Sequence, residues 1–213
     1  MTITEPVTLL TDYVLAGVTA WLGWRLWAAR ETHAARRLWS VAFGALALAA
    51  LAGGTHHGFT LLLSGTALVA LWKVAVLSVG IASFCMLYGS ATATTAGGIR
   101  GLLLVLAGAK LVLYSLWMLA HDDFVFVIAD TGSAMAGIAA LHLWSLLRSR
   151  DNASQWILGA VGISVLAAAA QAGGYAPHPH FNHNDLYHVI QIVAMILYYK
   201  GARLLREYPV SAP

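Results

Sequence analysis

Long apolar stretches dominate this sequence, and their length is the feature that most limits its fold. A helix needs about 20 mainly apolar residues to cross a bilayer. Hydrophobic residues make up 60% of the chain and charged residues only 10%, which is more apolar than a soluble domain. We therefore predict an all-α, multi-pass membrane protein with a single domain over residues 1–213. The seven predicted helices cover about residues 7–29, 36–63, 66–90, 98–120, 124–147, 153–174 and 183–204.

The N-terminal residues and the single cysteine narrow the class further. The first six residues lack the basic region of a cleavable signal peptide, so the first apolar stretch is expected to remain as a helix. Cys85 is the one cysteine in the sequence and excludes an internal disulfide. Its apolar neighbours indicate a small buried hydrophobic side chain.

Basic residues gather on one side of the predicted bundle, whereas Glu5, Asp12, Asp122 and Asp123 fall on the other. Because basic loops stay in the cytoplasm, we predict an outer N-terminus and a cytoplasmic C-terminus. The Ala- and Leu-rich composition and short loops favour a bacterial plasma membrane. The same segregation explains the net charge of +3, so we expect membrane lipids as partners and no nucleic acid. The basic residues are Arg25, Arg30, Arg36, Arg37, Arg100, Arg148, Arg150, Lys200, Arg203 and Arg206.

An internal repeat is indicated when the chain is aligned with itself at an offset of 120 residues, which places the segment from Leu15 over that from Met135. Chance produces such matches in Ala- and Gly-rich sequences, and this alternative stays open. We predict parallel halves of about residues 7–90 and 124–204, joined by a linker helix at about 98–120. Sites in repeat-built membrane proteins lie at the repeat interface, so the second, third, sixth and seventh helices are expected to line a cavity.

Histidines cluster where the predicted helices meet the outer face, and ionisable groups at membrane depth usually mark a site. His56 and His57 are adjacent late in the second helix, so their rings point about 100° apart and cannot share one metal ion. One is expected to face the cavity and the other to pack; the alternative is that both bond to carbonyl groups. The clustered histidines are His56, His57, His121, His178, His180, His183 and His188.

The seventh predicted helix carries a polar stripe of Asn184, His188 and Gln191, with Asp185 at its edge. Asp185 is suited to bind a cation or to hold the His188 ring in one tautomer. The alternative is that Asn182 or Asn184 caps the helix and Asp185 is a first-turn acid favoured by the helix dipole. That alternative leaves His188 and Gln191 unexplained, so a functional stripe is favoured.

Asp130 lies about two turns into the fifth predicted helix, a depth at which a carboxylate needs a basic or metal partner. Lys73, at a similar depth in the third helix, is the expected ion-pair partner. For Lys110, in the fourth helix, pairing and extension to the membrane surface both remain open.

Seven helices, a histidine late in the second and another early in the seventh resemble the membrane hydrolase superfamily of alkaline ceramidases, progestin and adipoQ receptors and haemolysin-III-like proteins. In that superfamily one histidine of the second helix and two of the seventh hold zinc. The second and seventh helices run oppositely, so His57 and His188 are expected at one depth. The chain departs from the family pattern at Asn184, where a histidine is expected, at Gly53, where a serine is expected, and at Lys73, where an aspartate is expected.

The resemblance implies a zinc-dependent hydrolase acting on a lipid amide or ester. A hydrolytic zinc needs three protein ligands and one position for water. Asp130 or Asp185 would then act as the base. The candidate ligands are His56 or His57, His188, and His183 or Asp185.

Transport is the main alternative, because three-plus-one-plus-three repeats also build sugar and amino-acid carriers, whose Pro-Gln signature is missing here. His57, Lys73, Asp130 and His188 would then form a proton or cation path for a transporter or channel of small solutes. His142 is the one ionisable candidate in the inner half, so a one-sided pocket is favoured. A retinal protein would need a lysine midway along the seventh helix, and a purely structural subunit remains open.

Overall fold

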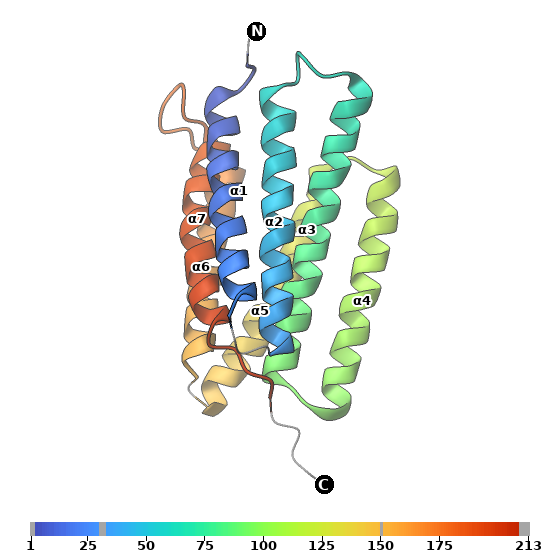
Figure 1. The fold of residues 1–213 in the computed structure, drawn as a ribbon, viewed down its shortest axis with the longest axis vertical. Helices are drawn as coiled ribbons and strands as arrows, with labels where there is room; N and C mark the ends of the chain where they lie inside the picture. The colour runs from blue at the N-terminus through green and yellow to red at the C-terminus, as the bar shows by residue number, and fades with distance from the viewer. Residues whose placement is uncertain (1–2, 30–32, 150, 209–213) are drawn as a thin grey trace.

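A computed structural model describes residues 3–29, 33–149 and 151–208. Arg30 and Arg150, two of the basic residues used to predict orientation, lie outside the described residues. The described chain is an all-helical bundle, as predicted (Figure 1). Its helices are α1 (Pro6–Trp27), α2 (Ala34–Gly58), α3 (Gly65–Thr94), α4 (Gly97–Ala120), α5 (Phe124–Ser149), α6 (Asn152–Ala172) and α7 (His183–Ala202).

Six of the described helices, α1 to α6, are long and apolar enough to cross a membrane. The remaining helix, α7, has 20 residues, but Asn184, Asp185, His188 and Gln191 interrupt its apolar sequence. Asp185 and His188 are buried against other helices. The chain is therefore a multi-pass membrane protein, while its orientation and internal repeat remain predictions.

Side-chain caps define where several helices begin. The Ser64 hydroxyl accepts a hydrogen bond from the Ala67 N–H at the start of α3, and Asp151 caps α6. At α7, Asn182 and Asp185 form a reciprocal capping box. This last cap matters for function because it fixes the helix end that carries His188.

The helices pack so that α4 lies at the edge of the bundle against α3, while α2 contacts both α1 and α3, and α6 contacts α7 (Figure 1). We name the two ends of the bundle after the predicted orientation. The outer end carries the N-terminus and the α2–α3, α4–α5 and α6–α7 connections. The inner end carries the starts of α2, α4 and α6 and the C-terminal tail.

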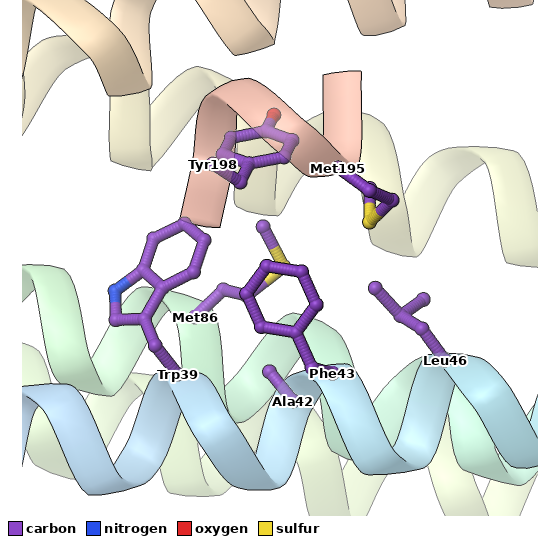
Figure 2. A pocket seen from close by; sticks show the side chains of 7 residues that line it. All are labelled: Trp39, Ala42, Phe43, Leu46, Met86, Met195 and Tyr198. Carbon is purple, nitrogen blue, oxygen red and sulfur yellow. The ribbon is translucent and has the colours of Figure 1, made fainter. Parts of the chain in front are cut away.

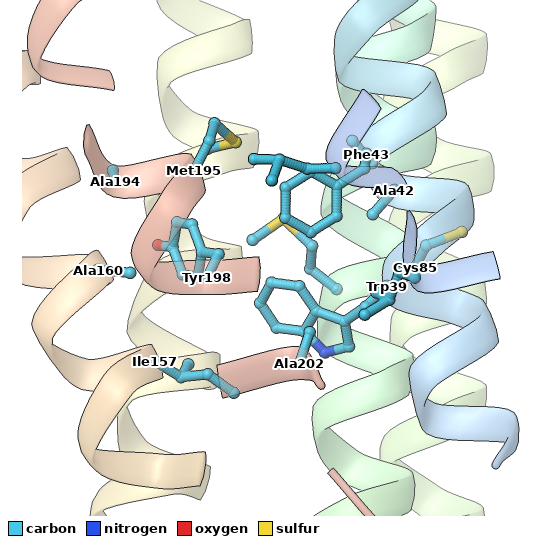
Figure 3. Packing of buried hydrophobic residues seen from close by; sticks show 14 of the residues in the cluster. Trp39, Ala42, Phe43, Cys85, Ile157, Ala160, Ala194, Met195, Tyr198 and Ala202 are labelled. Carbon is cyan, nitrogen blue, oxygen red and sulfur yellow. The ribbon is translucent and has the colours of Figure 1, made fainter. Parts of the chain in front are cut away.

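Large side chains of α2, α3 and α7 fill the centre of the inner half. Trp39, Phe43, Met86, Met195 and Tyr198 are each at most 3% exposed. Figure 2 shows them converging, and the Trp39 and Tyr198 ring centroids are 5.3 Å apart. Figure 3 shows α6 closing this cluster from the side beyond α7. We call these five side chains the floor, because they lie below the cavity described next.

Candidate active-site cavity

A cavity of about 610 Å³ lies above the floor and reaches the outer half of the bundle. Side chains from α1, α2, α3, α5, α6 and α7 line it. Its volume is in the range of small-molecule sites. Most of the lining is apolar, and polar side chains gather towards the outer end. These polar residues include Asp12, His57, Gln171, Asn184, His188 and Gln191.

Asp12 of α1 and His188 of α7 meet at the outer end of the cavity. Asp12 Oδ1 lies 3.2 Å from His188 Nε2, and the two residues are only 4% and 8% exposed. The second ring nitrogen, Nδ1, shares a hydrogen bond of 3.0 Å with Thr11 Oγ1. At this distance a carboxylate attracts the protonated form of an imidazole ring. The pair is therefore suited to holding and releasing a proton.

Two glycines of α2 shape the wall beside Asp12. A Cβ atom on Gly54 would lie 2.7 Å from the Asp12 Cβ, so the missing side chain allows α1 and α2 to approach. Gly53 lines the cavity, and a Cβ there would meet nothing within 4 Å. One glycine therefore permits packing, while the other keeps the cavity wide.

The structure separates the two neighbouring histidines of α2. His57 lines the cavity, and its Nδ1 lies 3.4 Å from Glu5 Oε1. The His56 Nδ1 instead hydrogen-bonds with the Leu68 carbonyl at 3.2 Å, and its ring packs near Trp72. The expectation that one ring faces the cavity and the other packs is confirmed, with His57 in the cavity.

Asp185 holds the start of α7 and is not among the cavity-lining residues. It is 1% exposed, and its Oδ2 accepts the Asn182 N–H at 2.7 Å. Its Oδ1 also lies 3.5 Å from the Thr11 hydroxyl, the group that contacts His188. Asp185 is thus a first-turn acid beside the N-cap Asn182, as the alternative interpretation predicts, and it orients the Thr11–His188 contact.

Other outer-end histidines lie away from the cavity lining. His183 is the first residue of α7, and His178 and His180 belong to the preceding loop. The His180 N–H donates to His178 Nδ1 at 3.1 Å, which occupies one ring nitrogen within the loop. Of the described histidines, only His57 and His188 line the cavity.

Asp130 forms an ion pair with Lys110 of α4, so the predicted pairing with Lys73 is wrong. Lys73 instead reaches the outer end of α4, where its Nζ donates to the Met118 carbonyl at 2.6 Å and lies 2.7 Å from Asp122 Oδ1. The physical reason is that α4 packs beside α3 and places its own lysine opposite α5. Asp130 is therefore absent from the cavity lining, and its basic partner is Lys110.

The donor atoms around the cavity meet only part of what a zinc ion needs. Within residues 3–29, 33–149 and 151–208, no three His, Cys, Asp or Glu side chains converge closely enough to hold a metal ion. Asp12 Oδ1 and His188 Nε2, 3.2 Å apart, have about the spacing of two ligands on one tetrahedral zinc. His57 lines the same cavity but its Nδ1 contacts Glu5. The residues thus supply two of the three ligands that a catalytic zinc needs.

The cavity opens sideways between α5 and α6. Ile128 and Val165 line it from these two helices, yet they are 55% and 58% exposed, as expected at a mouth. Gly132, also in the lining, has open space where a Cβ would stand. Near the inner end, His142 Nδ1 and Ser154 Oγ join the two helices at 2.8 Å. This arrangement indicates an opening that faces the membrane.

Comparison with known proteins identifies the family of this chain and nothing further. The model described as "Family of unknown function (DUF6962)" matches residues 7–207. The chain belongs to this family. No curated protein and no solved structure matches the chain.

In this DUF6962 chain, sequence reasoning missed the residue that completes the site. The charge distribution of the sequence marks Asp12 only as an acid on the outer side, whereas the structure buries it against His188. The available signal was a carboxylate inside the first apolar stretch, about one and a half turns from its start. Thr11 carried no comparable signal, because a threonine in a membrane helix usually bonds to its own backbone.

Proposed function

We propose that this chain is a membrane-embedded hydrolase that cleaves an amide or ester bond of a lipid. The observation that carries the proposal is the Asp12–His188 pair at the polar end of an otherwise apolar cavity. Polar groups placed at one end of an apolar pocket fix the orientation of an amphiphilic ligand. The linkage beside the polar head would then lie next to the acid–base pair.

The mouth between α5 and α6 supports a lipid substrate. Ile128 and Val165 are apolar and exposed at that mouth, so an acyl chain entering from the bilayer would meet hydrocarbon. The cavity continues between apolar walls to the floor at Met86 and Met195. A substrate that is already dissolved in the membrane needs no aqueous entrance.

The proposed chemistry uses water as the nucleophile. Asp12, which lines the cavity, takes a proton from water through Oδ2 while His188 stabilises the carboxylate through Oδ1. The resulting hydroxide attacks the carbonyl carbon. Gln191, one turn below His188, lines the cavity and can donate its amide N–H to the carbonyl oxygen. When the C–N or C–O bond breaks, the proton held by the Asp12–His188 pair passes to the amine or alcohol that leaves.

We propose zinc as a cofactor, and the donor set defines what its binding requires. The His57 ring would have to leave Glu5 and join Asp12 and His188. Neither His56 nor His183 lines the cavity. The proton transfers described above do not depend on this rearrangement.

The floor favours a one-sided site over a transport path. Trp39, Phe43 and Tyr198, which Figure 2 shows converging, are buried directly below the cavity. The space between them is too small to hold a water molecule. Further inside, His142 is fully buried and bonded through Nδ1 to Ser154 at 2.8 Å and through Nε2 to Ser90 at 3.1 Å. Its two nitrogens are therefore engaged in joining α3, α5 and α6.

The orientation and membrane are proposed from the distribution of basic and aromatic residues. Several cations near the inner end stack on aromatic rings, as expected at a membrane interface. We infer a cytoplasmic inner end and a bacterial plasma membrane, with α1–α3 and α5–α7 as the repeat halves. The stacked pairs are Arg25–Trp21, Arg148–Trp144, Lys200–Trp156 and Arg203–Tyr199.

The proposal is tested by hydrolysis of fluorogenic N-acyl and O-acyl lipids in mixed micelles. We expect wild-type turnover and a loss of about 10²–10⁴-fold in Asp12→Asn. Asp122→Asn, which removes an exposed acid outside the cavity, is the matched control and should retain the wild-type rate. Full activity of Asp12→Asn would refute the assignment, as would the absence of turnover for every amide and ester in a protein that still binds them.

Metal content measured on protein purified without chelators tests the cofactor separately. About one zinc per chain, lost in both His57→Ala and His188→Ala, would establish the three-ligand arrangement. Full hydrolase activity in metal-free protein would exclude zinc as the cofactor and would still be consistent with the Asp12–His188 chemistry.

A further inference from the structure

We infer that the cavity selects amphiphiles with a cationic or neutral hydrogen-bonding head, such as a long-chain amine or alcohol, and discriminates against carboxylates and phosphates. This inference deepens the proposed function and rests on the same cavity. It concerns recognition of the head group, so binding measurements test it independently of turnover.

The charges around the cavity carry the inference. Asp12 lines the outer end, with Asp185 and Glu5 close enough for their charges to interact with it. No lysine or arginine is among the described lining residues. An anionic head would therefore meet a carboxylate with no fixed positive charge beside it, whereas an ammonium group would find an acceptor in Asp12 Oδ2.

The two lysines within the third and fourth helices, Lys73 and Lys110, pair with acids outside the cavity lining. Lys73 contacts Asp122 and the carbonyls at the outer end of α4. Lys110 pairs with Asp130, which is absent from the cavity lining. Neither ammonium group is positioned to neutralise a phosphate or carboxylate bound next to Asp12.

Polar atoms below the Asp12–His188 pair favour a head group that donates hydrogen bonds. Gln191 and Thr19 line the cavity one and two turns deeper. Gln191 Oε1 and Thr19 Oγ1 have no hydrogen-bond partner in the described part of the chain, and Thr19 is 1% exposed. Gln191 Oε1 accepts hydrogen bonds, and the Thr19 hydroxyl can accept as well as donate, so a hydroxyl, amine or amide N–H finds acceptors here.

Displacement of radiolabelled dodecylamine from detergent-purified protein tests this selectivity. The competitors are dodecylamine, dodecanol and dodecanoate, which share one chain and differ in the head. We expect dodecylamine to bind at least about tenfold more tightly than dodecanoate, with dodecanol between them. Equal or tighter binding of dodecanoate would overturn the inference.

Variants locate the selectivity in the cavity. Asp12→Asn should remove most of the preference for the amine, while Asp122→Asn should keep the full preference. Gly132→Phe, at the mouth where a side chain meets open space, should weaken all three ligands alike and keeps the test valid if the Asp12 variant does not fold. A preference that persists in Asp12→Asn, or amine binding that Gly132→Phe leaves unchanged, would place the amine elsewhere. Selective binding without turnover would refute only the hydrolase proposal.

Discussion

Gly54→Ala tests how the helix packing positions Asp12. The added Cβ would lie 2.7 Å from the Asp12 Cβ and 3.1 Å from the Tyr13 ring, against 3.4–4 Å for ordinary contacts. The Asp12 Cβ is fixed to the α1 backbone, so rotation of the side chain cannot relieve this clash. We therefore expect α1 and α2 to separate by about 0.7 Å or more at this level.

The expected change in unfolding free energy follows from comparison with the neighbouring glycine, Gly53. Overpacking of this kind costs about 1–3 kcal/mol, which Gly54→Ala should lose relative to the same substitution made without a clash. Gly53→Ala adds the same methyl group where nothing lies within 4 Å, and replacing a helical glycine by alanine stabilises by about 1 kcal/mol. Both variants gain the same helix propensity, so they should differ in unfolding free energy by roughly the overpacking cost of about 1–3 kcal/mol.

The assay is reversible unfolding in mixed micelles, followed by tryptophan fluorescence, together with dodecylamine binding. Gly54→Ala should unfold earlier and bind the amine more weakly, because moving α1 takes Asp12 away from its 3.2 Å contact with His188. Gly53→Ala should unfold slightly later than wild type and bind the amine about as tightly, because the added methyl group meets nothing within 4 Å. Equal stability of the two variants would refute the close approach of α1 and α2, and unchanged amine binding in a destabilised Gly54→Ala would separate Asp12 from the ligand.

Two further predictions concern charges outside the cavity. Lys110→Met leaves Asp130, whose side chain is 3% exposed, without its cation and should cost about 3–5 kcal/mol; adding Asp130→Leu should restore most of it, and additive losses in this double-mutant cycle would argue against the pair. Burial opposes ionisation of Asp151, but hydrogen bonds from Ser145 and Ser154 outweigh it and lower its pKa below the usual 3.8. Its carboxylate therefore stabilises the fold fully above about pH 5 and progressively less as the pH falls through the lowered pKa. The stability difference between wild type and Asp151→Asn should shrink below pH 3.8, and a difference independent of pH would contradict this assignment.

Helix positions were predictable from the sequence because they depend on local composition. The stretches predicted at about 98–120 and 124–147 correspond to α4 (Gly97–Ala120) and α5 (Phe124–Ser149). The boundary at the end of α2 was less accurate, since the helix stops at Gly58 although apolar residues continue to Leu63. Hydropathy alone does not predict this boundary, because the helix ends while the sequence is still apolar.

The candidate site was predictable in part. The helical period placed His188 on a polar stripe, and both His57 and His188 line the cavity. The choice between His56 and His57 required the rotation of α2, which depends on contacts with α1 and α3. The partner of Asp130 likewise required the position of α4, because two lysines lie at similar depths and only packing distinguishes them.

The sequence by itself determined the class of this protein and the approximate extent of its helices, because bilayer thickness converts the length of an apolar stretch directly into a membrane span. The sequence also identified His57 and His188 as candidate residues, and both line the cavity. Only the tertiary structure decided that Asp12 completes that site, since α1 and α7 stand side by side although they lie at opposite ends of the chain. Which polar side chains meet depends on helix rotation and neighbour choice, and these are set by packing across the whole bundle.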